Sequence, residues 1–173
     1  MVALLRGVNV GGIKVPMGEL RSMLESAGLD EPRTYLQSGN VIVPAPPADP
    51  QQVSKIIEDS IRDGLGLEIR VITRTKGELA KVVEGNPFDG PEVNPTMLHA
   101  VFLESEPTAD RVARLDPDRS PSDRFQVSGR EIYVHYPGGS GRSKFNLAYI
   151  ERQLGIAGTA RNWNTVTKLA SML

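Results

Sequence analysis

The feature that most constrains the fold is an order of predicted strands and helices that occurs twice along the chain. In each half a strand is followed by a helix, a hairpin of two strands, a second helix and a fourth strand, and each half ends with one more helix. This βαββαβ order is typical of the ferredoxin-like unit, with its antiparallel sheet. The sequence therefore predicts an α+β protein of two tandem ferredoxin-like halves.

Hydrophobic periodicity and turn-forming residues place the predicted elements. In the first half we expect strands at residues 2–8, 33–37, 40–43 and 68–73, with helices at 16–27, from 50 and from 75. In the second half we expect strands at 97–103, 125–127, 132–136 and 156–160, with helices at 108–115, 144–154 and 163–171. The two halves are thus predicted as residues 1–84 and 96–173, joined by a linker at 85–95.

Capping residues support three of these helices. Asp49 and Asn162 stand where a side chain can accept from the first free N–H groups of a helix. Thr75 and Glu78 have the spacing of a capping box. We therefore expect helices to begin after each of these positions.

A fixed offset of 87 residues aligns the ends of the two halves. Arg74 then matches Arg161, and Lys81 matches Lys168. Duplication of one domain is the interpretation we favour, and a shared plan without duplication is the alternative. Separate domains of about 85 residues would each bury about 60% of their unfolded surface, against about 70% for one unit, so we expect the halves to pack together.

Composition excludes several kinds of site. The 173 residues include no cysteine, which excludes disulfides, thiolate metal sites and a cysteine nucleophile. Two histidines are too few for a centre with several imidazole ligands. The net charge of −1 excludes a strongly basic chain, although residues 130–173 carry six Lys and Arg against two Glu. Any anion must therefore bind a local patch.

A glycine-rich segment at residues 6–14 leads from the first predicted strand towards a helix. Backbone N–H groups of such a segment can point at an anion. The spacing fits neither G-x-G-x-x-G nor the P-loop pattern, and a tight turn with positive φ explains the glycines as well. The candidate ligand-binding residues are Arg6, Asn9, Gly11, Gly12 and Lys14.

A second glycine-rich segment, residues 138–144, also leads from a strand to a helix. Its candidates are Arg142, Ser143 and Lys144, although their order does not match a P-loop. An anion-binding loop and a mobile surface loop are both consistent with it. Ordering of this loop on ligand binding is expected if the first interpretation holds.

Two further polar segments have structural explanations beside functional ones. Arg161 and Asn164 flank Trp163, which we expect to fill the core, and both are candidate ligand contacts near a helix N-terminus. Ser38 and Asn40 lie at a predicted hairpin turn. These two gain a role in ligand binding only if the fold brings them to the 6–14 segment, and the expected antiparallel pairing does so.

The histidines and the N-terminus suggest no specialised role. Tyr133 and His135 share one strand face and His99 lies on a neighbouring strand, but the aromatic pattern of an RNA-recognition motif is absent, so we favour structural roles. The short apolar run 2–5 fits neither a signal peptide nor a membrane span, so we expect a cytoplasmic protein.

Five segments together resemble one known family. Residues 4–12, 34–41, 86–88, 141–144 and 159–166 are similar to the bacterial family called domain of unknown function 1697. The resemblance implies a small cytosolic bacterial protein with tandem ferredoxin-like halves. It implies no established activity and supplies no catalytic residue.

The sequence leaves three functions open. We favour a non-catalytic protein that holds a phosphate-bearing ligand, such as a nucleotide, a phosphometabolite or a nucleic-acid segment, between loops of the two halves. The second is an enzyme on a phosphorylated or nucleotide substrate, with Ser38 or Ser143 as nucleophile or Lys144 as electrostatic stabiliser, although no general base is evident. The third is a protein-interaction module. No cofactor or metal is predicted.

Overall fold

The chain forms two compact units. The structure is a computed structural model that describes residues 1–9, 12–44, 46 and 49–173. The first unit comprises Met1–Ala80 with Leu169–Leu173, and the second comprises Lys81–Lys168. The segment expected as a linker, 85–95, groups with the second unit.

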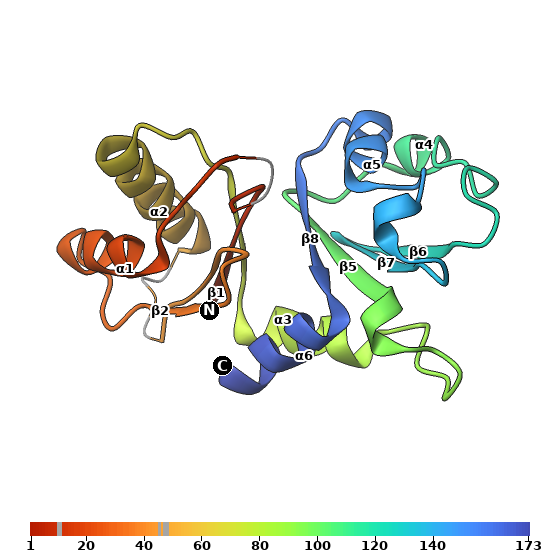
Figure 1. The fold of residues 1–173 in the computed structure, drawn as a ribbon, viewed down its shortest axis with the longest axis horizontal. Coiled ribbons are helices and arrows are strands. Elements are labelled where there is room, and N and C mark those ends of the chain that lie inside the picture. Colours follow the sequence, from red (N-terminus) through yellow and green to blue (C-terminus); the bar gives the residue numbers. More distant parts are fainter. Residues whose placement is uncertain (10–11, 45, 47–48) are drawn as a thin grey trace. The chain divides into compact units, whose positions relative to one another are not determined.

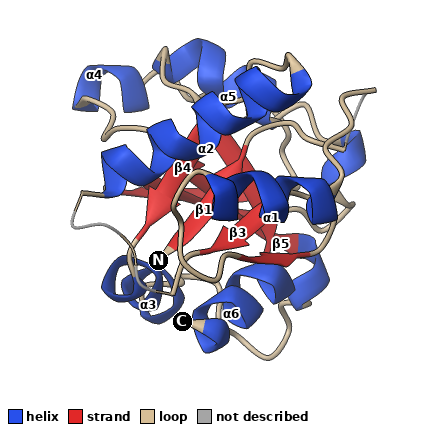
Figure 2. Cartoon of the chain, turned by 90° about the vertical axis from the view of Figure 1, so that its left-hand side faces the viewer, coloured by secondary structure: helices blue, strands red, loops and turns tan. Residues whose placement is uncertain are grey.

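The first unit is a four-stranded antiparallel sheet with two helices on one face (Figures 1 and 2). The strand order is β2-β3-β1-β4, so β1 is central and pairs with both β3 and β4. The elements are β1 (Val2–Leu5), α1 (Met17–Ser26), β2 (Arg33–Tyr35), β3 (Asn40–Ile42), α2 (Pro50–Leu65) and β4 (Val71–Arg74). Helix α3 (Lys76–Glu84) crosses from the first unit into the second.

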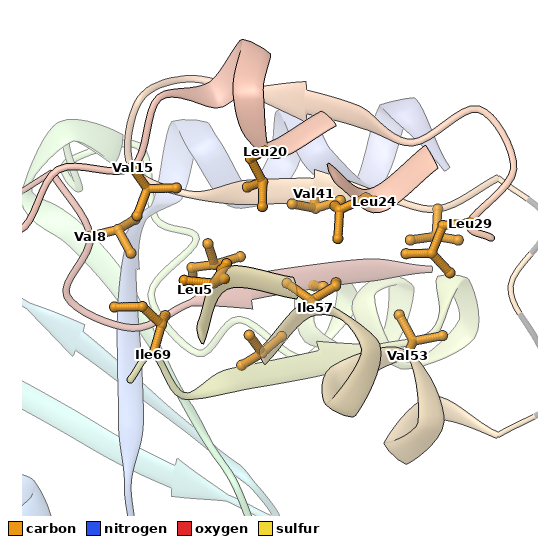
Figure 3. Packing of buried hydrophobic residues seen from close by; sticks show 14 of the residues in the cluster. Leu5, Val8, Val15, Leu20, Leu24, Leu29, Val41, Val53, Ile57 and Ile69 are labelled. Carbon is orange, nitrogen blue, oxygen red and sulfur yellow. The ribbon is translucent and has the colours of Figure 1, made fainter. Parts of the chain in front are cut away.

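Alternate residues of the first sheet form its core with α1 and α2. Ala3, Val41 and Val71 point to the helix side and are buried. Leu20 and Leu24 of α1, with Val53 and Ile57 of α2, belong to this cluster (Figure 3). Ile61 of α2 completes it. The i, i+4 spacing of the α2 residues places them on one stripe, and so explains why this segment is an amphipathic helix.

The second unit has the same strand order in its own antiparallel sheet, β6-β7-β5-β8. Its elements are the 3-10 turn η1 (Pro95–Met97), β5 (Leu98–Leu103), α4 (Ala109–Val112), β6 (Arg124–Ser128), β7 (Glu131–His135), the 3-10 turn η2 (Ser140–Arg142), α5 (Leu147–Leu154), β8 (Gly158–Asn162) and α6 (Trp163–Met172). Val101, Ile132 and Val134 of this sheet pack against Ile150 and Leu154 of α5 to form the core of the unit. Figure 1 shows α5 beside this sheet.

The structure confirms the predicted α+β class and the predicted helix caps. Among the described residues there are two four-stranded antiparallel sheets and six α-helices. Asp49 accepts from Gln51 N at 2.9 Å, and Thr75 Oγ1 accepts from Glu78 N at 3.2 Å. Asn162 Oδ1 likewise accepts from Asn164 N at 3.1 Å.

Several predicted boundaries were wrong. The first strand ends at Leu5 rather than at residue 8, because Gly7 adopts a φ of 69° and turns the chain out of the sheet. Helix α5 begins at Leu147 rather than at 144, because Asn146 is its cap and accepts from Tyr149 N at 3.0 Å. Strands β4 and β8 begin later than expected, at Val71 and Gly158.

None of the helices in the described part of the chain is long and apolar enough to cross a membrane.

Candidate functional site

Three connections meet at one end of the first sheet. They are residues 6–16 after β1, the turn at residues 36–39 between β2 and β3, and the segment before β4. Leu5 N donates to Gly39 O at 2.8 Å, and Arg6 N donates to Arg70 O at 2.9 Å. The predicted antiparallel pairing of the first and third strands is therefore confirmed, with Leu4 opposite Asn40.

The side chain of Asn9 joins the β1–α1 connection at Val15 and also joins it to the turn at Gln37. Its Oδ1 accepts from Val15 N at 3.0 Å, and its Nδ2 donates to Val15 O at 3.1 Å and to Gln37 O at 2.5 Å. Its backbone N–H donates to Ile13 O at 2.8 Å, and its φ is 55°. Asparagine tolerates this left-handed conformation better than most residues. The side chain of Asn9 thus positions the loop, and both of its amide hydrogens are used.

A pocket of about 370 Å³ opens beside Asn9. Its walls include the apolar side chains of Ile13, Val15 and Pro16, and one cation, Lys14. The full lining is Asn9, Gly12, Ile13, Lys14, Val15, Pro16 and Gln37. Lys14 is exposed, and in the described part of the chain no hydrogen bond or ion pair joins its ammonium group. Apolar walls with one cation suit a ligand that has an apolar body and an anionic group.

The turn beside the pocket depends on a glycine that the sequence interpretation treated only as part of a hairpin signal. Gly39 has a φ of 75°, and a Cβ added there would overlap Val8 Cγ2 and lie 2.8 Å from Leu5 Cβ. Leu36 also adopts positive φ, at 57°. The turn spans residues 36–39 rather than two residues, because this close approach fixes its path against β1.

The other predicted residues of the first unit lie around the pocket rather than in its lining. Asn40 is fully buried, and its Nδ2 donates to Tyr35 O at 2.8 Å and to Ser38 Oγ at 3.1 Å. This side chain holds the turn together. Ser38 and Arg6 are exposed. Gly11 lies outside the described residues.

In the second unit, Ser143 is tied into the loop that follows β7. Its hydroxyl donates to Asp123 Oδ2 at 2.5 Å and accepts from Phe145 N at 2.8 Å. A carboxylate therefore stands beside this predicted nucleophile. Arg142 and Lys144, on either side of Ser143, are exposed.

Arg161 and Asn164 occupy contrasting environments. Arg161 is 6% exposed, and its Nη1 donates to Thr159 Oγ1 at 2.7 Å and to Ala160 O at 2.8 Å. Burial lowers the pKa of its guanidinium to about 10, so the group is still a cation at neutral pH. Asn164 is exposed in the first turn of α6, and Trp163 is buried against Tyr133, with ring centroids 6.1 Å apart.

Both histidines pack against aromatic side chains of the second unit. His99 packs edge-on against Tyr136, with ring centroids 5.3 Å apart, and burial lowers its pKa. His135 lies beside Phe88, and Arg124 Nη2 is 3.3 Å from His135 Nδ1. Burial lowers the pKa of His135 as well, and the nearby charge of Arg124 adds to this effect.

One arrangement of charged and aromatic side chains in the second unit was not predicted from the sequence. The Cζ atoms of Arg119 and Arg152 lie 4.8 and 5.8 Å from the centroid of the Tyr149 ring. Arg119 Nε also donates to Lys144 O at 3.4 Å. The i, i+3 spacing of Tyr149 and Arg152 on a helix was the one signal of this contact in the sequence.

The described residues contain no group of three His, Asp or Glu side chains placed to hold a metal ion.

Comparison with known proteins gives a family and a fold. A family model described as "Protein of unknown function (DUF1697)" matches residues 1–133. The solved structure of the conserved bacterial protein SP0830 from Streptococcus pneumoniae is similar with a TM-score of 0.76 at 20% identity, covering 99% of this chain and 96% of that one. None of the curated proteins compared matches the sequence. At this identity the structural likeness shows the fold alone.

Proposed function

Since this chain belongs to the DUF1697 family, whose description assigns no activity, we propose a function from its own geometry: it binds a small phosphate-bearing organic molecule without transforming it. The pocket beside Asn9 and Lys14 carries this proposal. Lys14 would bind the phosphate, and the apolar walls would contact the body of the ligand. A nucleotide or a sugar phosphate has this combination of groups.

The length of the β1–α1 connection supports a role beyond joining two elements. It has eleven residues, 6–16, whereas the corresponding β5–α4 connection of the second unit has five, 104–108. Both sheets have the same strand order, so the sheet itself does not require the longer connection. Long loops on a rigid scaffold are common positions for binding residues.

Positive charge at this end of the sheet supports an anionic ligand. Arg6, Lys14 and Arg70 are all exposed there, and Glu68 is the nearby acid on the segment before β4. The backbone hydrogen bond from Arg6 N to Arg70 O holds the backbones of these two residues side by side. Such surface cations attract a phosphate more strongly at low salt, so ligand binding should weaken as ionic strength rises.

An enzyme is the second candidate, because of the pair formed by Ser143 and Asp123. A nucleophilic serine needs a general base beside its hydroxyl, and the sequence alone indicated none. In the structure the Asp123 carboxylate lies 2.5 Å from the Ser143 hydroxyl. The same hydroxyl accepts from Phe145 N, so its hydrogen bonds also stabilise the loop. This candidate would be favoured over a binding protein if the wild-type protein turned over a phosphorylated substrate and Ser143→Ala, with its loop still folded, did not.

We also propose that each unit is ferredoxin-like and that the two units arose by duplication. The strand orders β4-β1-β3-β2 and β8-β5-β7-β6 support this. So does the burial of residues related by the offset of 87, since Arg74 and Arg161 are both buried, as are Leu79 and Val166.

Thermal unfolding in the presence of candidate ligands tests the binding function. The panel consists of nucleoside monophosphates, sugar phosphates and inorganic phosphate at millimolar concentration, with wild-type protein, Lys14→Gln and Lys55→Gln. A ligand at 100 times its Kd stabilises the folded state by about 2.7 kcal/mol. Lys55 is a matched control because it lies on α2 of the same unit, outside the pocket lining, in an exposed ion pair with Asp59.

We expect one class of organic phosphate to raise the Tm of the wild-type protein and of Lys55→Gln, and to leave Lys14→Gln unchanged. Failure of every compound to stabilise the wild-type protein would overturn the proposal. Equal stabilisation of Lys14→Gln would also overturn it. If neither ligand nor turnover is found, the exposed apolar side chains of Ile13 (39%) and Leu36 (51%) make protein binding the function to test next.

A further inference from the structure

The second unit carries a cationic group of side chains that is separate from the pocket of the first unit. We call it the arginine–tyrosine cluster, and it consists of Arg119, Lys144, Tyr149 and Arg152. Arg119 belongs to the segment before β6, and Tyr149 and Arg152 lie one helical turn apart on α5. The cluster therefore joins two segments that are about thirty residues apart in the sequence.

Tyr149 is held firmly at the centre of this cluster. It is 5% exposed, its hydroxyl accepts from Asp116 N at 2.9 Å and donates to Arg114 O at 3.4 Å. Its ring also packs against Phe145, with centroids 5.5 Å apart. A ring held by Phe145 and by two hydrogen bonds of its hydroxyl gives the two guanidinium groups a rigid surface on which to lie.

The two arginines are oriented but their charges are not neutralised by acids. Their guanidinium carbons lie 4.8 and 5.8 Å from the same ring centroid, which is the range of a cation–π contact. In the part of the chain that the structure describes, no carboxylate forms an ion pair with Arg119, Lys144 or Arg152. All three side chains are exposed. Stacked guanidinium groups retain outward N–H groups that can donate to an anion.

The nearby acids make other hydrogen bonds. Asp116 Oδ1 accepts from Asp118 N at 2.9 Å, Asp123 accepts from the Ser143 hydroxyl, and Glu151 Oε1 accepts from Gly158 N at 2.8 Å. Asp116 and Glu151 thereby stabilise the local backbone, and Asp123 holds the Ser143 side chain. The surface over Tyr149 consequently presents two guanidinium groups whose attraction for an external anion is only partly offset. Lys144 adds an exposed cation in the segment whose backbone oxygen accepts from Arg119 Nε.

From this geometry we propose that the arginine–tyrosine cluster binds phosphate groups, as a site independent of the Lys14 pocket. Planar guanidinium groups match the oxygens of a phosphate through paired hydrogen bonds, which are stronger than bonds between neutral groups. Tyr149 is buried beneath the arginines, so it has no free face on which a nucleobase could stack. Recognition is therefore by phosphate charge rather than by base identity, and a partner with several linked phosphates fits best.

Two sources of linked phosphates are distinguished by two probes. One is tripolyphosphate, and the other is a fluorescent single-stranded oligonucleotide of mixed sequence, each titrated at 50 and 200 mM salt. We expect at least one probe to bind the wild-type protein, and each of Arg119→Gln and Arg152→Gln to bind it about tenfold more weakly. For the oligonucleotide, loss of one phosphate contact should reduce the slope of log K against log salt by about 0.7.

Control variants separate the loss of these particular side chains from a general loss of positive charge or of folding. Arg124→Gln removes an arginine that is also stacked on a ring, Phe88, with Cζ 5.3 Å from the centroid, but that lies outside the cluster. It should bind normally, as should Lys55→Gln, whose lysine lies in an exposed ion pair with Asp59 outside both sites. Arg119→Lys keeps the charge and should retain part of the affinity. The proposal is overturned if neither probe binds at 50 mM salt, or if Arg119→Gln and Arg152→Gln bind as well as Arg124→Gln does.

Discussion

The side-chain amide of Asn9 donates to the carbonyl oxygen of Gln37 at 2.5 Å, across 28 positions of sequence. This bond joins the β1–α1 connection to the turn between β2 and β3. Since Asn9 also bonds both backbone groups of Val15, one side chain closes the loop and holds the turn against it. The shape of the pocket beside Lys14 thus depends on a residue whose own polar atoms are directed into the protein.

Replacing Asn9 should therefore destabilise the first unit. Asn9→Ala removes three side-chain hydrogen bonds. It also puts alanine, which has a Cβ but no polar side chain to compensate, at a φ of 55°. We expect a loss of about 2 kcal/mol in the free energy of unfolding, measured by urea denaturation. Asn9→Gly should cost about 1 kcal/mol less, because glycine adopts this φ without strain. Unchanged stability in Asn9→Ala would contradict the role assigned to the amide.

Gly39 and Gly7 offer a comparison between steric overlap and backbone strain. Both have positive φ, 75° and 69°, but a Cβ at Gly39 meets Val8 and Leu5 whereas one at Gly7 meets nothing within 4 Å. Gly7→Ala should cost about 1 kcal/mol from strain alone. Gly39→Ala should cost roughly 2 kcal/mol more, because the added methyl group must displace buried neighbours. Equal midpoints of thermal unfolding in the two variants would argue against a tight approach of the turn to β1.

The regular elements were predictable because their signals are local. The stripe of Val53, Ile57 and Ile61 and the cap at Asp49 identify α2 without knowledge of the rest of the chain. The start of α5 shows how such signals can compete. The apolar stripe of Leu147, Ile150 and Leu154 is compatible with a start at residue 144, but the Asn146 side chain caps Tyr149 N and sets the first turn.

The pocket and the arginine–tyrosine cluster were much less predictable, because they depend on distant contacts. No pattern near Asn9 indicates that its amide reaches Gln37, and none near Arg119 indicates that it lies over Tyr149. Antiparallel pairing of β1 with β3 did predict that the first connection and the turn would meet. It could not predict which side chains would line the resulting space, since that depends on backbone conformations at Asn9, Leu36 and Gly39.

Ser143 gives a prediction that separates a structural hydroxyl from an exposed one. Ser143→Ala removes the bond to Asp123 and leaves Phe145 N without its acceptor. We expect a loss of about 1–2 kcal/mol in unfolding free energy. Ser140→Ala, at an exposed position of the same loop, should change it by less than about 0.5 kcal/mol. If chemical denaturation finds the two variants alike, the Ser143 hydroxyl does not stabilise the loop.

His99 predicts how the stability of the second unit depends on pH. Burial lowers the pKa of its imidazole, so the folded chain binds fewer protons than the unfolded chain, in which the pKa is about 6.5. The unfolding free energy should therefore be constant above this value and fall as the pH drops below it. Protonation is unfavourable here because Nδ1 is buried with no hydrogen-bond partner among the described residues.

Denaturation at pH 7.5 and 5.5 measures this dependence, with His99→Gln as the test variant. Glutamine does not titrate, so the variant should lose less stability on acidification than the wild-type protein does. His135 has a lowered pKa from burial and from Arg124, so part of the fall should remain. The double variant His99→Gln, His135→Gln should be the flattest of the three, because it removes both imidazoles whose pKa is lowered in the folded chain. A fall in His99→Gln as large as that of the wild-type protein would show that His99 is solvated, and that the acid sensitivity originates at other groups.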